Sequence, residues 1–187
     1  MVELKNNLRM TNAALLENAI HECGHAVLGA HFGVVAPNGR TKLWAGGRGR
    51  HGIGMSTWFG VVDFRSGERE LILIALLAGE ASQFRSLPRF ADKGWDSDLA
   101  TVWADAKATR SHWDRDEIQK LLLEYSADEG RRLQFLARCT ERAHSLVDEL
   151  WPVILKAARC LLRARHFSLG NKQIAKMLPP QASGNRR

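Results

Sequence analysis

The sequence is poor in cysteine, with three such residues in 187. No two of them form a CxxC pair, and their number is odd, which argues against a disulfide framework and against a cysteine-rich zinc site. Cys23, Cys139 and Cys160 all fall in segments with helical character. We therefore expect three buried, reduced thiols.

Long hydrophobic runs are also missing. The longest, from Leu71 to Gly79, is far shorter than the roughly 18 residues that a membrane-spanning helix needs. The N-terminus is mixed and polar, unlike a secretory signal peptide. These absences predict a soluble, cytoplasmic protein.

What is abundant is positive charge, with a formal net charge of +7 and a pI of about 9.8. Such an excess suggests nucleic acid or an acidic membrane as a partner. The basic residues are nevertheless scattered between one loop and the C-terminus: Arg40, Lys42, Arg48, Arg50, Arg186 and Arg187. We interpret them as a solvated surface and regard nucleic-acid binding as the less favoured alternative.

Hydrophobic periodicity predicts a mainly α protein with one domain over residues 1–180 and a disordered basic tail over 181–187. Residues 1–10 look like a loose lead-in, and residues 33–65 are rich in glycine. A small β element is therefore expected after the first helix, with strands at 52–59 and 61–64 and a loop over 36–51. The expected helices cover residues 12–32, 66–84, 114–125, 127–149, 152–165 and 170–178, and one more is expected to begin at 96 or 97 and to continue past 107.

The first helix contains the pentad HECGH at residues 21–25. Residues four apart lie about 40° apart around a helix axis, so His21 and His25 can offer ring nitrogens to one metal ion. Glu22 lies on the same side, close enough to take a proton from a water that zinc has acidified and to return it to a departing amine. The alternative is a pair of ordinary helix histidines with a surface acid. Because the helix is apolar nearly all round, burial of these three groups favours a compensating cation.

A catalytic zinc site usually has three protein ligands. His31 follows His25 by six residues, but on an unbroken helix it points about 240° away. Glu80, in LLAGEASQ, and Asp98, in GWDSDLATVWADA, are the other candidates. Spacing alone does not choose between these two acids.

Several stretches resemble the peptidase domain of the FtsH-type ATP-dependent zinc metalloproteases. HECGHAVLG is similar to that family's HEAGHA motif, and GIGMST at 52–57 to its edge strand beside the active site. ELILIALLAGEASQ and GWDSDLATVWADAKA are moderately similar to two later segments, and WPVILKAARCLLRARHFSLGNKQI is weakly similar to the last helices. The likeness covers roughly residues 12–175.

The resemblance implies a zincin-like helical domain with one zinc per chain, held by His21, His25 and Asp98, with Glu22 as general base and acid. It also implies that an extended peptide pairs with the edge strand formed by Gly52, Ile53, Gly54, Met55, Ser56 and Thr57. The expected function is zinc-dependent endopeptidase activity on extended or unfolded polypeptides. Because family members form rings, a homo-oligomer is also implied.

The chain departs from the family in important ways. It has no GxxxxGK[ST] pattern and no membrane helices, so the ATPase engine would have to be a separate partner. A catalytically silent or partner-dependent adaptor of the same fold therefore remains an alternative. The group that stabilises the oxyanion is not identified, since Tyr125 lies in a distant helix and His51 and His112 are only guesses.

Overall fold

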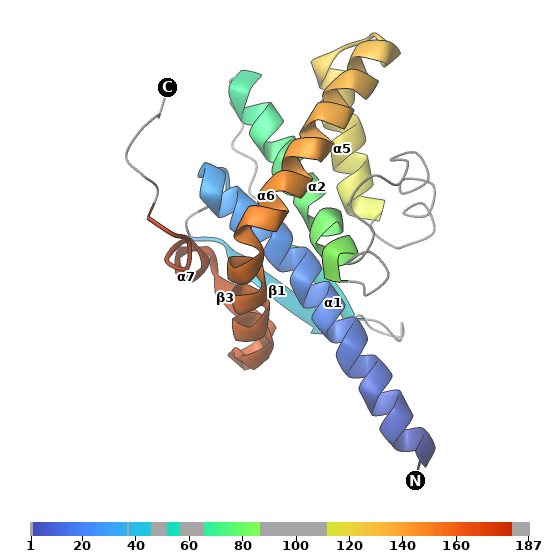
Figure 1. The fold of residues 1–187 in the computed structure, drawn as a ribbon, viewed down its shortest axis with the longest axis vertical. Helices are drawn as coiled ribbons and strands as arrows, with labels where there is room; N and C mark the ends of the chain where they lie inside the picture. The colour runs from blue at the N-terminus through green and yellow to red at the C-terminus, as the bar shows by residue number, and fades with distance from the viewer. Residues whose placement is uncertain (1, 37, 46–51, 57–65, 87–111, 181–187) are drawn as a thin grey trace.

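A computed structural model of the chain describes residues 2–36, 38–45, 52–56, 66–86 and 112–180 (Figure 1). The fold is mainly helical, as expected. Its helices are α1 (Val2–Phe32), α2 (Ser66–Ser86), α5 (His112–Tyr125), α6 (Glu129–Arg163) and α7 (Asn171–Ala175), and a 3₁₀ turn covers Arg165–Phe167. Its strands are β1 (Arg40–Ala45), β2 (Gly52–Ser56) and β3 (Ser168–Gly170).

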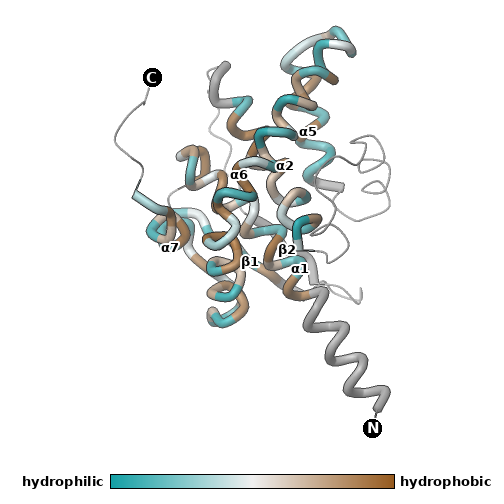
Figure 2. The backbone as a smooth tube through the Cα atoms, viewed as in Figure 1, coloured by the Kyte–Doolittle hydropathy of each residue, from teal (hydrophilic) through white to brown (hydrophobic). Residues whose placement is uncertain are grey.

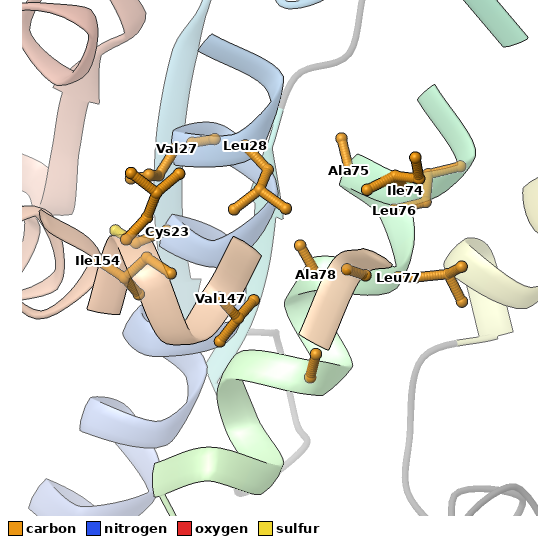
Figure 3. Packing of buried hydrophobic residues seen from close by; sticks show 14 of the residues in the cluster. Cys23, Val27, Leu28, Ile74, Ala75, Leu76, Leu77, Ala78, Val147 and Ile154 are labelled. Carbon is orange, nitrogen blue, oxygen red and sulfur yellow. The ribbon is translucent and has the colours of Figure 1, made fainter. Parts of the chain in front are cut away.

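The core lies where α1, α2 and α6 pack against one another. α1 runs diagonally through the molecule, α6 crosses it, and the N-terminal part of α1 extends away from the body (Figure 1). Cys23, Val27 and Leu28 of α1 lie close to Val147 and Ile154 of α6, and the apolar stretch 74–78 of α2 completes the cluster (Figure 3). Every residue from 22 to 29 is buried, so this part of α1 lies inside the domain.

The sheet is small and antiparallel, with strand order β2-β1-β3. β1 pairs with β2 from Thr41 opposite Ser56 to Ala45 opposite Gly52. Both strands contact α1, so the sheet lies on the same helix that carries the two histidines. The side chain of Asn171, just after β3, ties that strand to the start of β1. Its amide N–H donates to the carbonyl of Ala36, and its amide oxygen accepts from the hydroxyl of Thr41.

Three predictions about elements are wrong. Residues 2–10 continue α1 as a helix, and the expected loop over 36–51 contains β1. Pro152 does not separate two helices but lies inside the single helix α6. Hydrophobic and hydrophilic residues alternate along α6 with the helical repeat (Figure 2), and its buried positions continue on both sides of the proline. Packing of that continuous stripe outweighs the local cost of the proline.

The remaining predictions concern the three cysteines, membrane-spanning helices and three segments of the chain. Cys23 and Cys139 are buried, Cys160 is half-buried, and all three are free thiols. Within the described residues, no helix has both the length and the hydropathy to cross a bilayer. Residues 57–59 and 61–64 of the expected strands, the helix expected to begin at 96 or 97, and the tail 181–187 lie outside the described residues.

Candidate metal centre

His21 and His25 lie one turn apart on α1, as their spacing predicts. Their Nε2 atoms are 3.1 Å apart, and their rings meet edge to face with centroids separated by 4.6 Å. His25 is almost completely buried, while the side chain of His21 retains 12% exposure. Both imidazoles therefore point their Nε2 atoms toward one spot at the edge of the core.

A third donor comes from the first turn of α5. The Oδ2 atom of Asp114 lies 3.1 Å from Nε2 of His21 and 3.3 Å from Nε2 of His25. The three atoms form a nearly equilateral triangle. α1 and α5, which are far apart in the sequence, thus supply a group that could hold a metal ion.

The ring of His25 is oriented by α2. Its Nδ1–H donates to the backbone carbonyl of Ala75 at 2.9 Å, so in the neutral ring the lone pair is on Nε2, which faces the triangle. Gly79 makes room for the ring, because a Cβ atom at that position would lie 2.3 Å from both Cε1 and Nε2 of His25. A second glycine, Gly24 of α1, also lies in close contact with α2. A Cβ atom on Gly24 would lie 2.5 Å from the carbonyl oxygen of Ala78.

The three donors are strongly coupled electrostatically. Burial alone would lower the pKa of His25, but the nearby carboxylate of Asp114 offsets this and raises the pKa to about 9. Burial would also raise the pKa of Asp114, yet His25 and His21 hold it well below its usual range. In the metal-free protein a shared proton thus compensates the buried carboxylate, and a divalent cation can take over that role.

The triangle fits a small tetrahedral cation. Zinc bonds to histidine nitrogen and carboxylate oxygen are about 2.0–2.2 Å long, which places tetrahedral ligands roughly 3.3–3.5 Å apart. The observed separations of 3.1, 3.1 and 3.3 Å are within a few tenths of an ångström of that range. Two histidines and one carboxylate are also a donor set that catalytic zinc uses.

No family model and no curated protein matches this chain. The likeness to FtsH-type peptidases therefore stays a prediction.

Two further carboxylates lie close to the triangle. Glu22 is only 6% exposed, and its charge is among those that act on His25. Glu80 of α2 is half-buried; burial raises its pKa, and the charged groups that influence it are His21, Asp114, Arg115 and His25. Among the described residues, neither glutamate is one of the converging donors. Glu22 is therefore buried without being one of the three donors, and its role as a base stays a prediction.

The other predicted site residues have different outcomes. Asp98 and Thr57 lie outside the described residues, so their predicted roles are untested. Residues 52–56 form β2, and β2 is an edge strand of the described sheet. His31 is absent from the donor group and stacks edge to face on Phe32.

The structure removes one of the three candidates for the group that stabilises the oxyanion. Tyr125 lies at the opposite end of α5 from Asp114, roughly 16 Å along the helix at 1.5 Å per residue, and stacks on the ring of Phe135. His112 begins the same helix two residues before Asp114, and His51 is outside the described residues. Tyr125 is thereby excluded, and His112 remains a prediction.

Asp114 is the site residue that sequence reasoning missed. It follows His21 by 93 positions, and acids are common in the first turn of a helix because the backbone dipole favours them there. Only the local string SHWDRDE, with a histidine and two aspartates at the start of an amphipathic helix, could have suggested it.

Proposed function

We propose that this protein is a zinc-dependent endopeptidase that hydrolyses extended polypeptide, with an FtsH-like peptidase domain. The observation that carries the proposal is the convergence of His21, His25 and Asp114 within hydrogen-bonding distance of one another, beside a buried glutamate from the same helix. Two imidazoles and one carboxylate leave one tetrahedral position for a water or a substrate oxygen. That combination is typical of metal-assisted hydrolysis.

The residues of this chain have distinct roles in the proposed reaction. His21, His25 and Asp114 would hold the metal, and a bound zinc would acidify water and polarise a carbonyl group. The carboxylate of Glu22 would accept a proton from the water that attacks the peptide carbonyl carbon, and would pass this proton to the amine as the C–N bond breaks. Burial of Glu22 keeps competing solvent away from this transfer.

The proposed substrate is an extended chain because the edge strand β2 packs on α1, the helix that carries the two histidines. Within the described sheet, β2 pairs on one side only, with β1, and it also contacts α1. An unpaired strand edge offers backbone N–H and C=O groups to a peptide in β conformation, independently of the peptide's sequence. Unfolded polypeptides are therefore the substrate class that we propose, and a separate ATPase is the partner that would deliver folded ones.

Metal content tests the site directly. Purified protein should contain one zinc per chain by mass spectrometry, and Asp114→Ala should lose it because a three-ligand site becomes a two-ligand site. The matched variants Asp98→Ala and His31→Ala should keep their zinc. If Asp98→Ala loses zinc and Asp114→Ala keeps it, the ligand implied by the family resemblance is correct and Asp114 is not a ligand.

Turnover tests the chemistry. Wild-type protein should cleave a disordered substrate such as casein, a chelator should stop cleavage, and Glu22→Gln should retain zinc but lose at least roughly 100-fold in rate. Glu17→Gln, one helical turn away on α1, is the matched control. Full activity in Glu22→Gln refutes the proposed mechanism, whereas stoichiometric zinc without turnover on any peptide favours the adaptor alternative.

A further inference from the structure

The two histidines of the triangle differ in how their outer nitrogens are satisfied. Nδ1 of His25 donates to the carbonyl of Ala75, whereas Nδ1 of His21 is buried and has no hydrogen-bond partner among the described residues. Both residues present Nε2 to the triangle. His21 is thus a candidate ligand whose outer nitrogen has no hydrogen-bond partner in the described part of the chain.

Metal binding would raise the energetic cost of leaving Nδ1 of His21 without a hydrogen-bond partner. A histidine that coordinates through Nε2 carries its proton on Nδ1, so the Nδ1 of His21 would become an obligatory donor. Metal-bound histidines nearly always donate this proton to a carboxylate, a carbonyl or a water, which fixes the ring and strengthens the ligand. A buried donor without an acceptor is unfavourable. An acceptor is therefore needed next to His21.

Glu80 is the carboxylate best placed to be that acceptor. It follows Gly79, whose Cα lies directly against the ring of His25, and the Nε2 atoms of His25 and His21 are 3.1 Å apart. Among the charged groups that influence Glu80, His21 has the strongest effect. Asp114 is already committed to the Nε2 side of both rings. Glu22, next to His21 in the sequence, is the proposed general base, so the remaining rival on α1 is Glu17, one turn before His21.

We propose that Glu80 is a positioning residue: when the metal is bound, its carboxylate accepts the Nδ1–H of His21 and holds that imidazole in its coordinating orientation. Because Nδ1 of His21 has no partner among the described residues, the half-buried side chain of Glu80 would have to move to reach it. The inference rests on the proposed metal site and is independent of whether the site cleaves peptides. Glu80, which the sequence offers as a candidate ligand, would then act on the metal through the ring of His21 and not by direct coordination.

Zinc affinity, measured by competition with a chromogenic chelator, tests the proposal. Glu80→Ala should bind zinc roughly 10- to 100-fold more weakly than wild type, as loss of such outer partners typically does. Glu80→Asp should recover part of the loss, and Glu17→Ala should bind like wild type. Unfolding of the metal-free variants shows whether each is folded, so a general structural defect is separated from a defect in the metal site.

Nuclear magnetic resonance of wild-type protein labelled with ¹⁵N-histidine provides a second measurement that needs no variant. In the zinc-loaded protein, the Nδ1–H of His21 should give a resolved, slowly exchanging proton signal. Rapid exchange of this proton with solvent overturns the proposal, as does wild-type zinc affinity in Glu80→Ala. A loss of affinity confined to Glu17→Ala assigns the acceptor role to Glu17 and also overturns it.

The outcomes for Glu80 and for peptidase activity are separable. Tight zinc binding that weakens in Glu80→Ala, combined with no cleavage of casein by wild type, supports the positioning role and rejects the proposed function. Absence of zinc binding in wild type rejects both.

Discussion

Gly79 is the residue whose lack of a side chain lets His25 reach the triangle. The ring of His25 occupies the space that a Cβ atom would fill, at 2.3 Å from that position, and the same ring is tethered to Ala75 one turn earlier on α2. The imidazole cannot move aside without breaking this hydrogen bond. We therefore expect Gly79→Ala to weaken zinc binding at least roughly tenfold and to lower the free energy of unfolding by about 1–3 kcal/mol, the usual cost of overpacking. Chelator competition and urea denaturation measure the two effects.

A second glycine provides the matched control. Gly130 lies in the first turn of α6, where an added Cβ atom would meet only Asp128 Oδ1 at an ordinary 3.4 Å. Gly130→Ala should leave zinc affinity unchanged and raise stability by up to about 1 kcal/mol, because alanine is the better helix former. Equal effects of the two substitutions on zinc would contradict the steric explanation.

At the scale of elements, α5 is the helix whose attachment depends most on the site. Within its described residues only Ile118 and Leu121 are fully buried, and Arg69 of α2 pairs with Glu124 at 3.8 Å. Burial of two such side chains contributes about 1.5–3 kcal/mol each, while ordering each residue of the helix backbone costs about 1–2 kcal/mol. The contacts of Asp114 with the two histidines therefore contribute a large share of the free energy that holds α5 against the rest of the fold.

Removal of zinc should accelerate amide hydrogen exchange in residues 116–125 much more than in residues 143–161 of α6. Uniform acceleration across both helices would show that the metal stabilises the whole fold instead.

Pro152 defines a second prediction at the same scale. It is exposed inside α6, where it removes one backbone N–H from the helical hydrogen bonds, and buried side chains such as Val147, Leu150 and Ile154 lie on either side of it. Pro152→Ala should raise the free energy of unfolding by about 1–3 kcal/mol without changing zinc content. Pro179→Ala, beyond the end of α7, is the control and should have no effect. A destabilised Pro152→Ala would mean that the proline is needed for the path of the helix.

Features that depend on residues close together in the sequence could be predicted, whereas features that depend on contacts between distant segments could not. The boundaries of α2 and α5 were predicted within two residues, because caps and apolar periodicity are local, and the shared face of His21 and His25 follows from helical spacing alone. β1 was missed because its six residues, RTKLWA, lie between glycine-rich stretches and are stabilised by pairing with two other strands. Asp114 was missed for the same reason, since only tertiary packing brings α5 to α1. The continuous α6 shows packing overriding a local breaker.

For the whole molecule, the shifted pKa values of His25 and His144 predict how the free energy of unfolding depends on pH. His25 has a folded-state pKa raised to about 9 by Asp114 despite burial, so in metal-free protein its contribution is complete below pH 6.5 and is lost as the pH rises toward 9. Burial lowers the pKa of His144 on α6 to about 4, so the unfolded chain takes up a proton between pH 6.5 and 4 that the folded chain does not, and stability falls as the pH falls. Between pH 4 and pH 9, metal-free protein should thus be most stable near pH 6.5, and each histidine accounts for a loss of up to about 3 kcal/mol at its end of that range.

Urea denaturation at a series of pH values separates the two arms of this profile. Saturating zinc should abolish the alkaline loss, because His25 then binds metal instead of a proton, and should leave the acid arm in place down to the pH at which protons displace the metal. His144→Leu should flatten the acid arm in metal-free protein and leave the alkaline arm unchanged. Asp114→Asn should do the opposite, since an amide cannot hold the proton on His25. An alkaline arm that persists in Asp114→Asn would show that a group other than the His25–Asp114 pair titrates there, and would remove the electrostatic basis for placing a cation between α1 and α5.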